Sequence, residues 1–114
     1  MKITQKDIDN NKILVIQIEE EDNTRIEDIR EKESFKLLQS KVFKNNILVL
    51  EKNYKDDKLD GIYKQYFDDG SLEIEGQYKE DKPTGIFYYY RQDGRLWRRA
   101  EVEEDGTIND RYFD

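Results

Sequence analysis

Residues 61–72 read GIYKQYFDDGSL, and residues 85–96 read GIFYYYRQDGRL. The second stretch repeats the first 24 residues later, with its glycines, aromatic residues and leucine in the same places. A fixed period of this length is typical of a repeat array, in which each unit buries its apolar side chains by packing against its neighbours. Such arrays usually present a surface, so the repeat favours binding over catalysis.

The period extends towards the N-terminus. A shift of 24 residues aligns Leu48 with Leu72 and Tyr54 with Tyr78. Pairs of residues that favour turns recur at nearly the same interval, at Asp22-Asn23, Asn45-Asn46, Asp69-Gly70 and Asp93-Gly94. Because Asn, Asp and Gly tolerate left-handed backbone, such pairs between β-type runs indicate hairpins. The sequence therefore predicts an all-β fold, an antiparallel sheet of four consecutive hairpin repeats of about 24 residues.

The alternation of side chains predicts the register of the third hairpin. Residues 72, 74, 76 and 78 fall on one face of a strand. A two-residue loop at Asp69-Gly70 would place Phe67 opposite Leu72, and a bulged turn would shift this pairing by one residue. The same loop pairs Gln65 with Ile74, Lys64 with Glu75 and Tyr63 with Gly76. In the last pair, the Tyr63 ring would cover the backbone of the glycine.

Residues 24–40 allow two interpretations. Thr24 and Glu27 have the spacing of a helix capping box, and Ile26, Ile29 and Leu37 would lie on one side of a helix. The turn period instead requires strands in this stretch, and the strand interpretation is favoured.

Composition indicates a single soluble domain of 114 residues with degenerate hairpins in 1–40, clearer repeats in 41–103 and a C-terminal cap in 104–114. The 13 Tyr and Phe residues and one Trp argue against disorder. A net charge of −7 disfavours nucleic acid and anionic membranes as partners and favours a basic protein. The start of the chain lacks an apolar leader and no run has transmembrane length, so a cytoplasmic location is expected.

The two aligned stretches and their Tyr-Lys-x-x-Lys connectors resemble the variant MORN repeat of bacterial proteins, over residues 41–100. In that family a Trp usually occupies the positions of Tyr63 and Phe87, and Ala100 replaces the glycine found at Gly76. The resemblance implies an elongated, curved antiparallel sheet. It also implies a role in partner recognition, dimerisation or membrane binding, and some members are grouped with toxin–antitoxin antitoxins.

The sequence offers little for catalysis or for binding metals and cofactors. The chain has no His and no Cys, which removes the usual general base and the commonest metal ligands. The acidic runs at 56–61 and 7–12 lack the ligand pattern of a calcium loop. The run from Glu19 to Asp22 is better explained as a solvated turn than as a chelating site. No enzymatic activity, metal or cofactor is therefore predicted.

The charge of the chain is unevenly distributed. Residues 86–100 carry four Arg and one Asp, whereas residues 19–33 and 101–114 each have a net charge of −5. Within the basic hairpin, Trp97 and Arg99 stand where the preceding repeat has Glu73 and Glu75. With the two-residue turn, Tyr90 would oppose Trp97 and Tyr88 would oppose Arg99.

Trp, Tyr and Arg are enriched in the hot spots of protein interfaces. We therefore predict a protein-binding patch in the basic hairpin and a second in the acidic turn. The first comprises Tyr88, Tyr90, Arg95, Trp97 and Arg99; the second comprises Glu19, Glu20, Glu21 and Asp22. An alternative interpretation is that Trp97 caps the array beneath Tyr112 and Phe113.

Together these features predict a protein-binding repeat module, an antitoxin or immunity protein that neutralises a basic toxic partner by occluding it. The alternative is a membrane-associated or self-assembling MORN-like scaffold, with a homodimer formed by pairing of edge strands. Binding of nucleic acid is disfavoured because acidic segments flank the basic hairpin.

Overall fold

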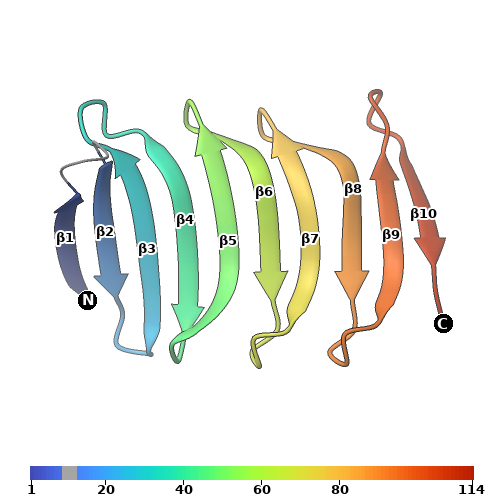
Figure 1. Ribbon diagram of the computed structural model, residues 1–114, viewed down its shortest axis with the longest axis horizontal. Coiled ribbons are helices and arrows are strands. Elements are labelled where there is room, and N and C mark those ends of the chain that lie inside the picture. The colour runs from blue at the N-terminus through green and yellow to red at the C-terminus, as the bar shows by residue number, and fades with distance from the viewer. Residues whose placement is uncertain (9–12) are drawn as a thin grey trace.

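The computed structural model describes residues 1–8 and 13–114, which form ten β-strands in one sheet (Figure 1). The order of the strands in the sheet is their order in the sequence, and every neighbouring pair is antiparallel. The strands are β1 (Lys2–Ile8), β2 (Ile13–Glu19), β3 (Thr24–Glu31), β4 (Leu37–Lys44), β5 (Ile47–Lys55), β6 (Lys58–Tyr66), β7 (Leu72–Lys79), β8 (Lys82–Tyr90), β9 (Leu96–Val102) and β10 (Ile108–Tyr112). The predicted all-β fold of consecutive hairpins is confirmed.

Residues 24–40 form strands, so the strand interpretation is confirmed and the short helix is wrong. β3 is hydrogen-bonded to β2 on one side and to β4 on the other. The residue that begins the suggested capping box, Thr24, instead donates its backbone N–H to Asp22 Oδ1 across 3.1 Å, which tightens the β2–β3 turn. Because pairing with two neighbours satisfies the backbone along the whole strand, it outweighs the local helix signal.

Tight turns join the strands at both ends of the sheet. In three of them, both central residues have positive φ: Asn45-Asn46, Asp56-Asp57 and Glu80-Asp81. This is the geometry of a two-residue hairpin turn whose twist matches that of the strands. Asp56-Asp57 and Glu80-Asp81 lie in segments that connect predicted hairpins, so these segments are hairpin turns too, and neighbouring hairpins form one continuous sheet.

The Asp-Gly turns are longer than predicted. Gly70 donates its N–H to the Phe67 carbonyl across 2.9 Å, and Phe67 donates to the Ser71 carbonyl across 2.8 Å, so the loop has three residues, 68–70. Gly70 has a φ of 91°, a left-handed conformation that closes the loop without steric cost. Asp69 Oδ1 accepts the Ser71 N–H across 2.8 Å and fixes the turn. The predicted two-residue loop and the Phe67–Leu72 pair are therefore wrong, and the alternative, a bulged turn that shifts this pairing by one residue to Tyr66–Leu72, is confirmed.

A β-bulge restores the predicted register one step later. Tyr66 lies opposite Leu72 and Gln65 lies opposite Ile74, so one extra residue, Glu73, is accommodated in β7. This extra residue offsets the extra residue of the loop. The three other predicted pairs are therefore confirmed: Gln65 with Ile74, Lys64 with Glu75 and Tyr63 with Gly76.

The same bulge in the next hairpin changes the position of the tryptophan. Tyr90 lies opposite Leu96 and Tyr89 lies opposite Arg98, so Trp97 is the extra residue of β9. The predicted pairing of Tyr90 with Trp97 is wrong, and the predicted pairing of Tyr88 with Arg99 is confirmed.

The core is thin. Among the described residues, the buried apolar side chains are Phe87, 6% exposed, and Ala100, 3% exposed. The Phe87 ring lies on Gly76, where a Cβ atom would overlap the ring. Tyr63 was expected to cover this glycine. Although Tyr63 does lie opposite Gly76, the atoms nearest to the glycine belong to Phe87. Edge-on ring contacts extend the packing from Phe87 to Tyr78 and from Tyr78 to Tyr63.

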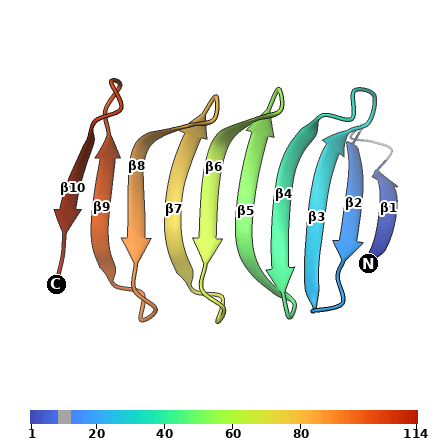
Figure 2. The same cartoon turned by 180° about the vertical axis from the view of Figure 1, so that it is seen from behind.

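The sheet is one layer thick. Figures 1 and 2 show the ribbon from opposite sides, and over the described residues neither a helix nor a second sheet covers either face. The molecule measures 46 × 32 × 23 Å and is moderately extended across its strands. Within the described ranges there is no helix of the length and apolarity needed to span a membrane.

Candidate functional site

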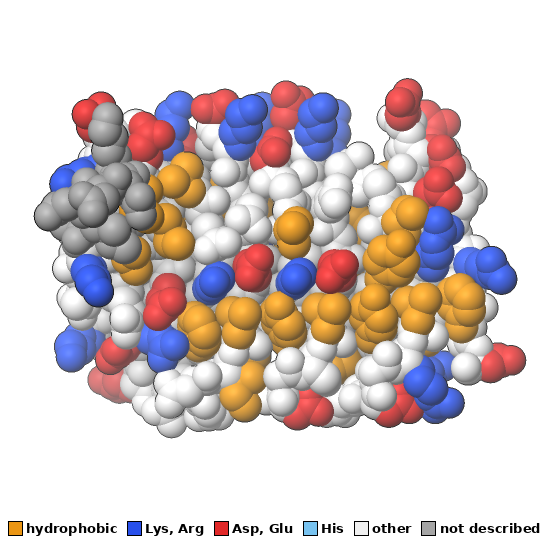
Figure 3. Space-filling view, in the orientation of Figure 1, with side chains coloured by type: hydrophobic (Ala, Val, Ile, Leu, Met, Phe, Trp, Pro, Cys, Tyr) orange, Lys and Arg blue, Asp and Glu red, His pale blue; other side chains and the backbone are white. Residues whose placement is uncertain are grey.

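The two faces of the sheet are distinct surfaces. We call the face turned towards the viewer in Figures 1 and 3 the front face, and the opposite one the rear face. Residues directly opposite each other on neighbouring strands share a face, and successive residues of a strand alternate between faces. Tyr88 and Arg99 share the front face with Lys64 and Glu75. Their sequence neighbours Tyr89 and Arg98 lie on the rear face.

An aromatic cluster occupies the rear face at the C-terminal end of the sheet. The Trp97 ring lies 6.0 Å from the Tyr89 ring and 6.1 Å from the Tyr112 ring, measured between centroids. The Arg98 guanidinium lies 4.5 Å from the centre of the Tyr89 ring and 6.0 Å from that of Tyr112. Arg91 lies 6.0 Å from the centre of the Trp97 ring. We call these five residues the rear cluster.

An ion pair holds the central arginine of the rear cluster. Arg98 Nε and the Asp110 Oδ1 atom are 2.8 Å apart, and this hydrogen bond raises the pKa of Arg98. The bond ties β10 to β9 on the rear face. Tyr112 remains 63% exposed, so the cluster is open to solvent on the β10 side. Its cation–aromatic contacts match the chemistry of interface hot spots.

The predicted patch in the basic hairpin is divided between the two faces. Tyr88, Tyr90 and Arg99 lie on the front face, where Arg99 is 3.7 Å from Glu101. Arg95 lies in the β8–β9 turn and pairs with Asp93 across 2.8 Å. Trp97 lies on the rear face. The expected grouping assumed a two-residue turn, and the bulge at position 97 moves the indole to the other side of the sheet.

The cap interpretation of Trp97 is supported by one of its two predicted contacts. Tyr112 packs against the indole, whereas Phe113 reaches Trp97 through the backbone, donating its N–H to the Trp97 carbonyl across 2.9 Å. The segment predicted as a cap is thus an outer strand of the sheet, β10.

Sequence reasoning missed Tyr89 and Arg98, and it named Tyr112 as a cover of Trp97 but not as part of a binding surface. A signal for both missed residues was present, because the repeat aligns Tyr89 with Gln65 and Arg98 with Ile74. A charged residue in place of an isoleucine marks a departure on the apolar side of the repeat. The departures on which the predicted patch rests, Trp97 and Arg99, lie on the polar side of the repeat.

A row of alternating charges crosses the front face. Each member lies opposite the next on the neighbouring strand, and the members are Glu27, Lys41, Glu51, Lys64 and Glu75. Lys64 Nζ lies 3.9 Å from a Glu75 carboxylate oxygen. Figure 3 shows the alternation as blue and red side chains over the middle strands. We call this set the charged row; of its contacts, only Lys64–Glu75 was predicted.

A row of apolar side chains runs beside the charged row, on the side of the Asp-Gly turns. It consists of three cross-strand pairs: Phe43 with Leu48, Tyr66 with Leu72, and Tyr90 with Leu96. All six side chains are half-buried. Burial raises the pKa of Tyr66 and of Tyr90. Figure 3 shows the continuous orange band that they form, and we call it the apolar row.

The predicted acidic patch lies at the β2–β3 turn, far from the rear cluster. Glu19 and Glu20 line a groove of about 380 Å3 with Asn23, Thr24, Arg25, Asn45 and Asn46. Glu19 accepts a hydrogen bond from Gln17, and bonds from Thr24 lower the pKa of Asp22. In the part of the chain that the structure describes, no group of three potential metal ligands comes together. Positions 9–12 of the acidic run 7–12 lie outside the described residues.

Comparison of the chain with protein families and with curated proteins gives no significant match. The resemblance to variant MORN repeats therefore rests on the two aligned stretches and their connectors, within residues 41–100. What the chain does has to be inferred from its open sheet.

Proposed function

We propose that this chain is a protein-binding repeat module, which acts as an antitoxin or immunity protein by covering the surface of a toxic partner. The observation that carries the proposal is the single-layer sheet. A sheet normally buries a face against a second layer of helices or strands. In the described residues both faces are open (Figures 1 and 2), and each carries aromatic and charged side chains.

The chemistry of these surfaces favours a protein partner. The rear cluster combines Trp, Tyr and Arg, the side chains that dominate interface hot spots. The net charge of −7 favours a basic partner and speeds its encounter. The absence of His and Cys from the sequence supports a function that depends on binding and assigns no catalytic step to the chain.

The test is a pull-down from lysate of the source cells with three baits: the wild type, Trp97→Ala and Arg99→Glu. Trp97 and Arg99 lie on opposite faces, so each variant reports on one face. We expect the wild type to capture one basic protein in stoichiometric amount and one of the variants to lose it. The proposal is wrong if the wild type, at low ionic strength, captures no protein in stoichiometric amount.

Self-association is a second candidate, favoured by a specific observation. The two outermost strands of the described sheet and the residue before β1 carry four large apolar side chains that are more than half exposed: Met1, Ile3, Ile108 and Tyr112. Outer strands also present unpaired backbone groups to a second copy. Light scattering over a range of protein concentrations tests this candidate, and a constant monomer mass would remove it.

A further inference from the structure

We propose that the front face is the docking surface for an amphipathic α-helix of the partner, laid across the strands along the apolar row. This inference rests on the proposed function and specifies which face binds and what it binds. It accounts for two features that the sheet itself does not require, the apolar row and the charged row beside it.

The spacing of the rows matches a helix. Neighbouring strands are about 4.8 Å apart, and an α-helix returns a side chain to the same side every ~5.4 Å. A helix lying across the strands therefore stays nearly in step with one side chain per strand. An extended strand in the same place presents a side chain every ~6.7 Å and falls out of step within two strands. A second copy of this chain offers no helix in its described residues.

The length of the apolar row sets the length of the helix. The row runs from Phe43 on β4 to Leu96 on β9, across six neighbouring strands. Five intervals of ~4.8 Å amount to about 24 Å, or ~16 residues of helix. This is an ordinary length for a surface helix, and its apolar side would cover the half-buried side chains of the row.

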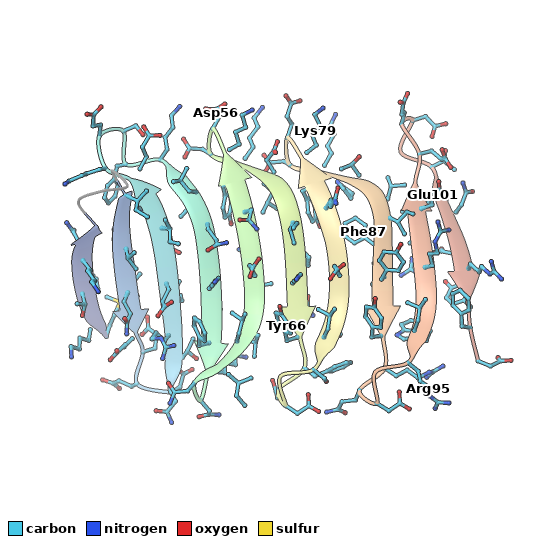
Figure 4. All side chains as sticks on the ribbon, in the orientation of Figure 1. Asp56, Tyr66, Lys79, Phe87, Arg95 and Glu101 are labelled. Carbon is cyan, nitrogen blue, oxygen red and sulfur yellow. The ribbon has the colours of Figure 1, made fainter. Side chains whose placement is uncertain are left out.

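The charges on the two sides of the apolar row define the polar sides of the helix. On one side lies the charged row, which is complementary to a helix flank of alternating charge. On the other side lie the turns of the sheet end where Figure 4 shows Tyr66 and Arg95. The three turns that border the row at this end carry Asp68, Asp69 and Asp93 against Arg91 and Arg95, and Arg95 pairs with Asp93 across 2.8 Å. The outer flank of the helix therefore carries basic residues where it passes Asp68 and Asp69, which agrees with a basic partner.

The probe for the test is a designed, fluorescein-labelled helical peptide of about 18 residues. It has a leucine stripe, lysines along one flank and alternating glutamate and lysine along the other. Two control peptides are used: one with the same composition scrambled to remove the stripe, and one with the lysine flank replaced by glutamates. Each is titrated with the full 114-residue chain, and fluorescence anisotropy reports binding. We expect the probe to bind at least about tenfold more tightly than either control.

Two variants locate the binding face. Leu72→Lys places a charge in the middle of the apolar row, and we expect it to weaken probe binding by about tenfold or more. Ile74→Lys places the same charge on the rear face of the same strand, at another half-buried position, and we expect probe binding to stay within about twofold of the wild type. Circular dichroism checks that each variant is folded.

Mapping the probe by NMR on the wild-type chain locates the binding face without any variant, so the result does not depend on whether the variants fold. With methyl-labelled protein, the probe is expected to shift the NMR signals of Leu48, Leu72 and Leu96 on the front face. The signals of Ile74 and Ala100, on the rear face, are expected to stay in place. Shifts confined to the rear face would overturn the inference.

Further outcomes separate this inference from the proposed function. It is overturned if the probe does not bind at protein concentrations up to about 1 mM, or if the scrambled peptide binds equally well. If a basic protein is captured by the wild type and by Leu72→Lys alike, the proposed function stands and the helix-docking face is wrong. If neither that protein nor the probe binds, both are wrong.

Discussion

Gly76 is the residue whose identity most constrains the packing of this sheet. Its missing side chain lets the Phe87 ring lie directly on the backbone of β7. Phe87 is in turn opposite Ala100, so two small residues flank the most buried aromatic ring of the described core. The glycine is required here for close approach.

Gly76→Ala is expected to destabilise the protein by about 1–3 kcal/mol, because the added methyl group would overlap the Phe87 ring and force it to move. Urea unfolding monitored by circular dichroism measures the loss. Phe87→Leu in the same chain is expected to make the two losses less than additive, since the smaller side chain leaves room for the methyl group. Lys79→Ala, at an exposed position of the same strand, is the control and should change stability by less than about 0.5 kcal/mol. A loss equal to that of the control would contradict the role of the glycine.

Three aspartates couple the stability of the turns to pH. Hydrogen bonds from Ser71, Arg95 and Thr107 lower the pKa of Asp69, Asp93 and Asp105 below the ordinary value of 3.8. A carboxyl whose pKa is lowered by folding stabilises the protein above its unfolded pKa, and this contribution is lost as the pH falls through the folded pKa. We therefore expect the urea midpoint to fall as the pH is lowered from about 5 to about 2.

The matched variant replaces all three aspartates with asparagine, which still accepts the backbone hydrogen bonds but does not titrate. Its urea midpoint is expected to fall less steeply over the same pH range. A slope identical to that of the wild type would mean that other carboxylates cause the acid sensitivity.

At the scale of the element, the hairpin shows what the sequence can and cannot predict. Asp69-Gly70 and Asp93-Gly94 correctly located the turns, because a glycine with positive φ marks the place of the loop. They did not reveal whether the loop has two or three residues, since both kinds use these residue types. The bulges at Glu73 and Trp97 carry no signal of their own. One unpredicted residue in β9 therefore decided which face the indole occupies.

Tyr112 on β10 is expected to shield the indole of Trp97, the single tryptophan of the chain. Tyr112→Ala should shift the tryptophan emission to longer wavelength and increase its quenching by acrylamide, because the ring that packs on the indole is removed. Ile108→Ala, an exposed residue of the same strand, is the control and should leave the emission unchanged. Equal effects of the two substitutions would show that β10 shields the indole as a whole, without a specific ring contact.

At the scale of the whole molecule, the 24-residue period predicted the sheet of hairpins. The charged row was predictable in part, because Lys64 opposite Glu75 follows from the register of one hairpin. Extending it to Glu27, Lys41 and Glu51 needs the pairing of β3 with β4, of β4 with β5 and of β5 with β6, and β3 lies in the degenerate stretch 1–40. The rear cluster depends on β10, and the sequence predicted that segment as a cap with no strand of its own.

Hydrogen exchange is expected to be graded across the sheet. The inner strands β5 to β8 are paired on both sides, whereas β1 and β10 each have one neighbour among the described strands. Opening an outer strand breaks backbone hydrogen bonds to one neighbour, whereas opening an inner strand breaks those to two. The amides of the outer strands should therefore exchange fastest, and those of the inner strands slowest. Mass spectrometry of the exchanging protein measures the gradient. Uniform protection across all strands would show that the sheet opens as a single unit.

Because the strands follow one another in the sheet in the same order as in the sequence, the chain can be lengthened by whole repeats. Inserting one further 24-residue unit would add two strands, and about 10 Å of surface, without any existing pair having to be broken and re-formed elsewhere. Each insertion would prolong the apolar and charged rows by the same increment. Gene duplication can thus lengthen the proposed binding surface in fixed steps.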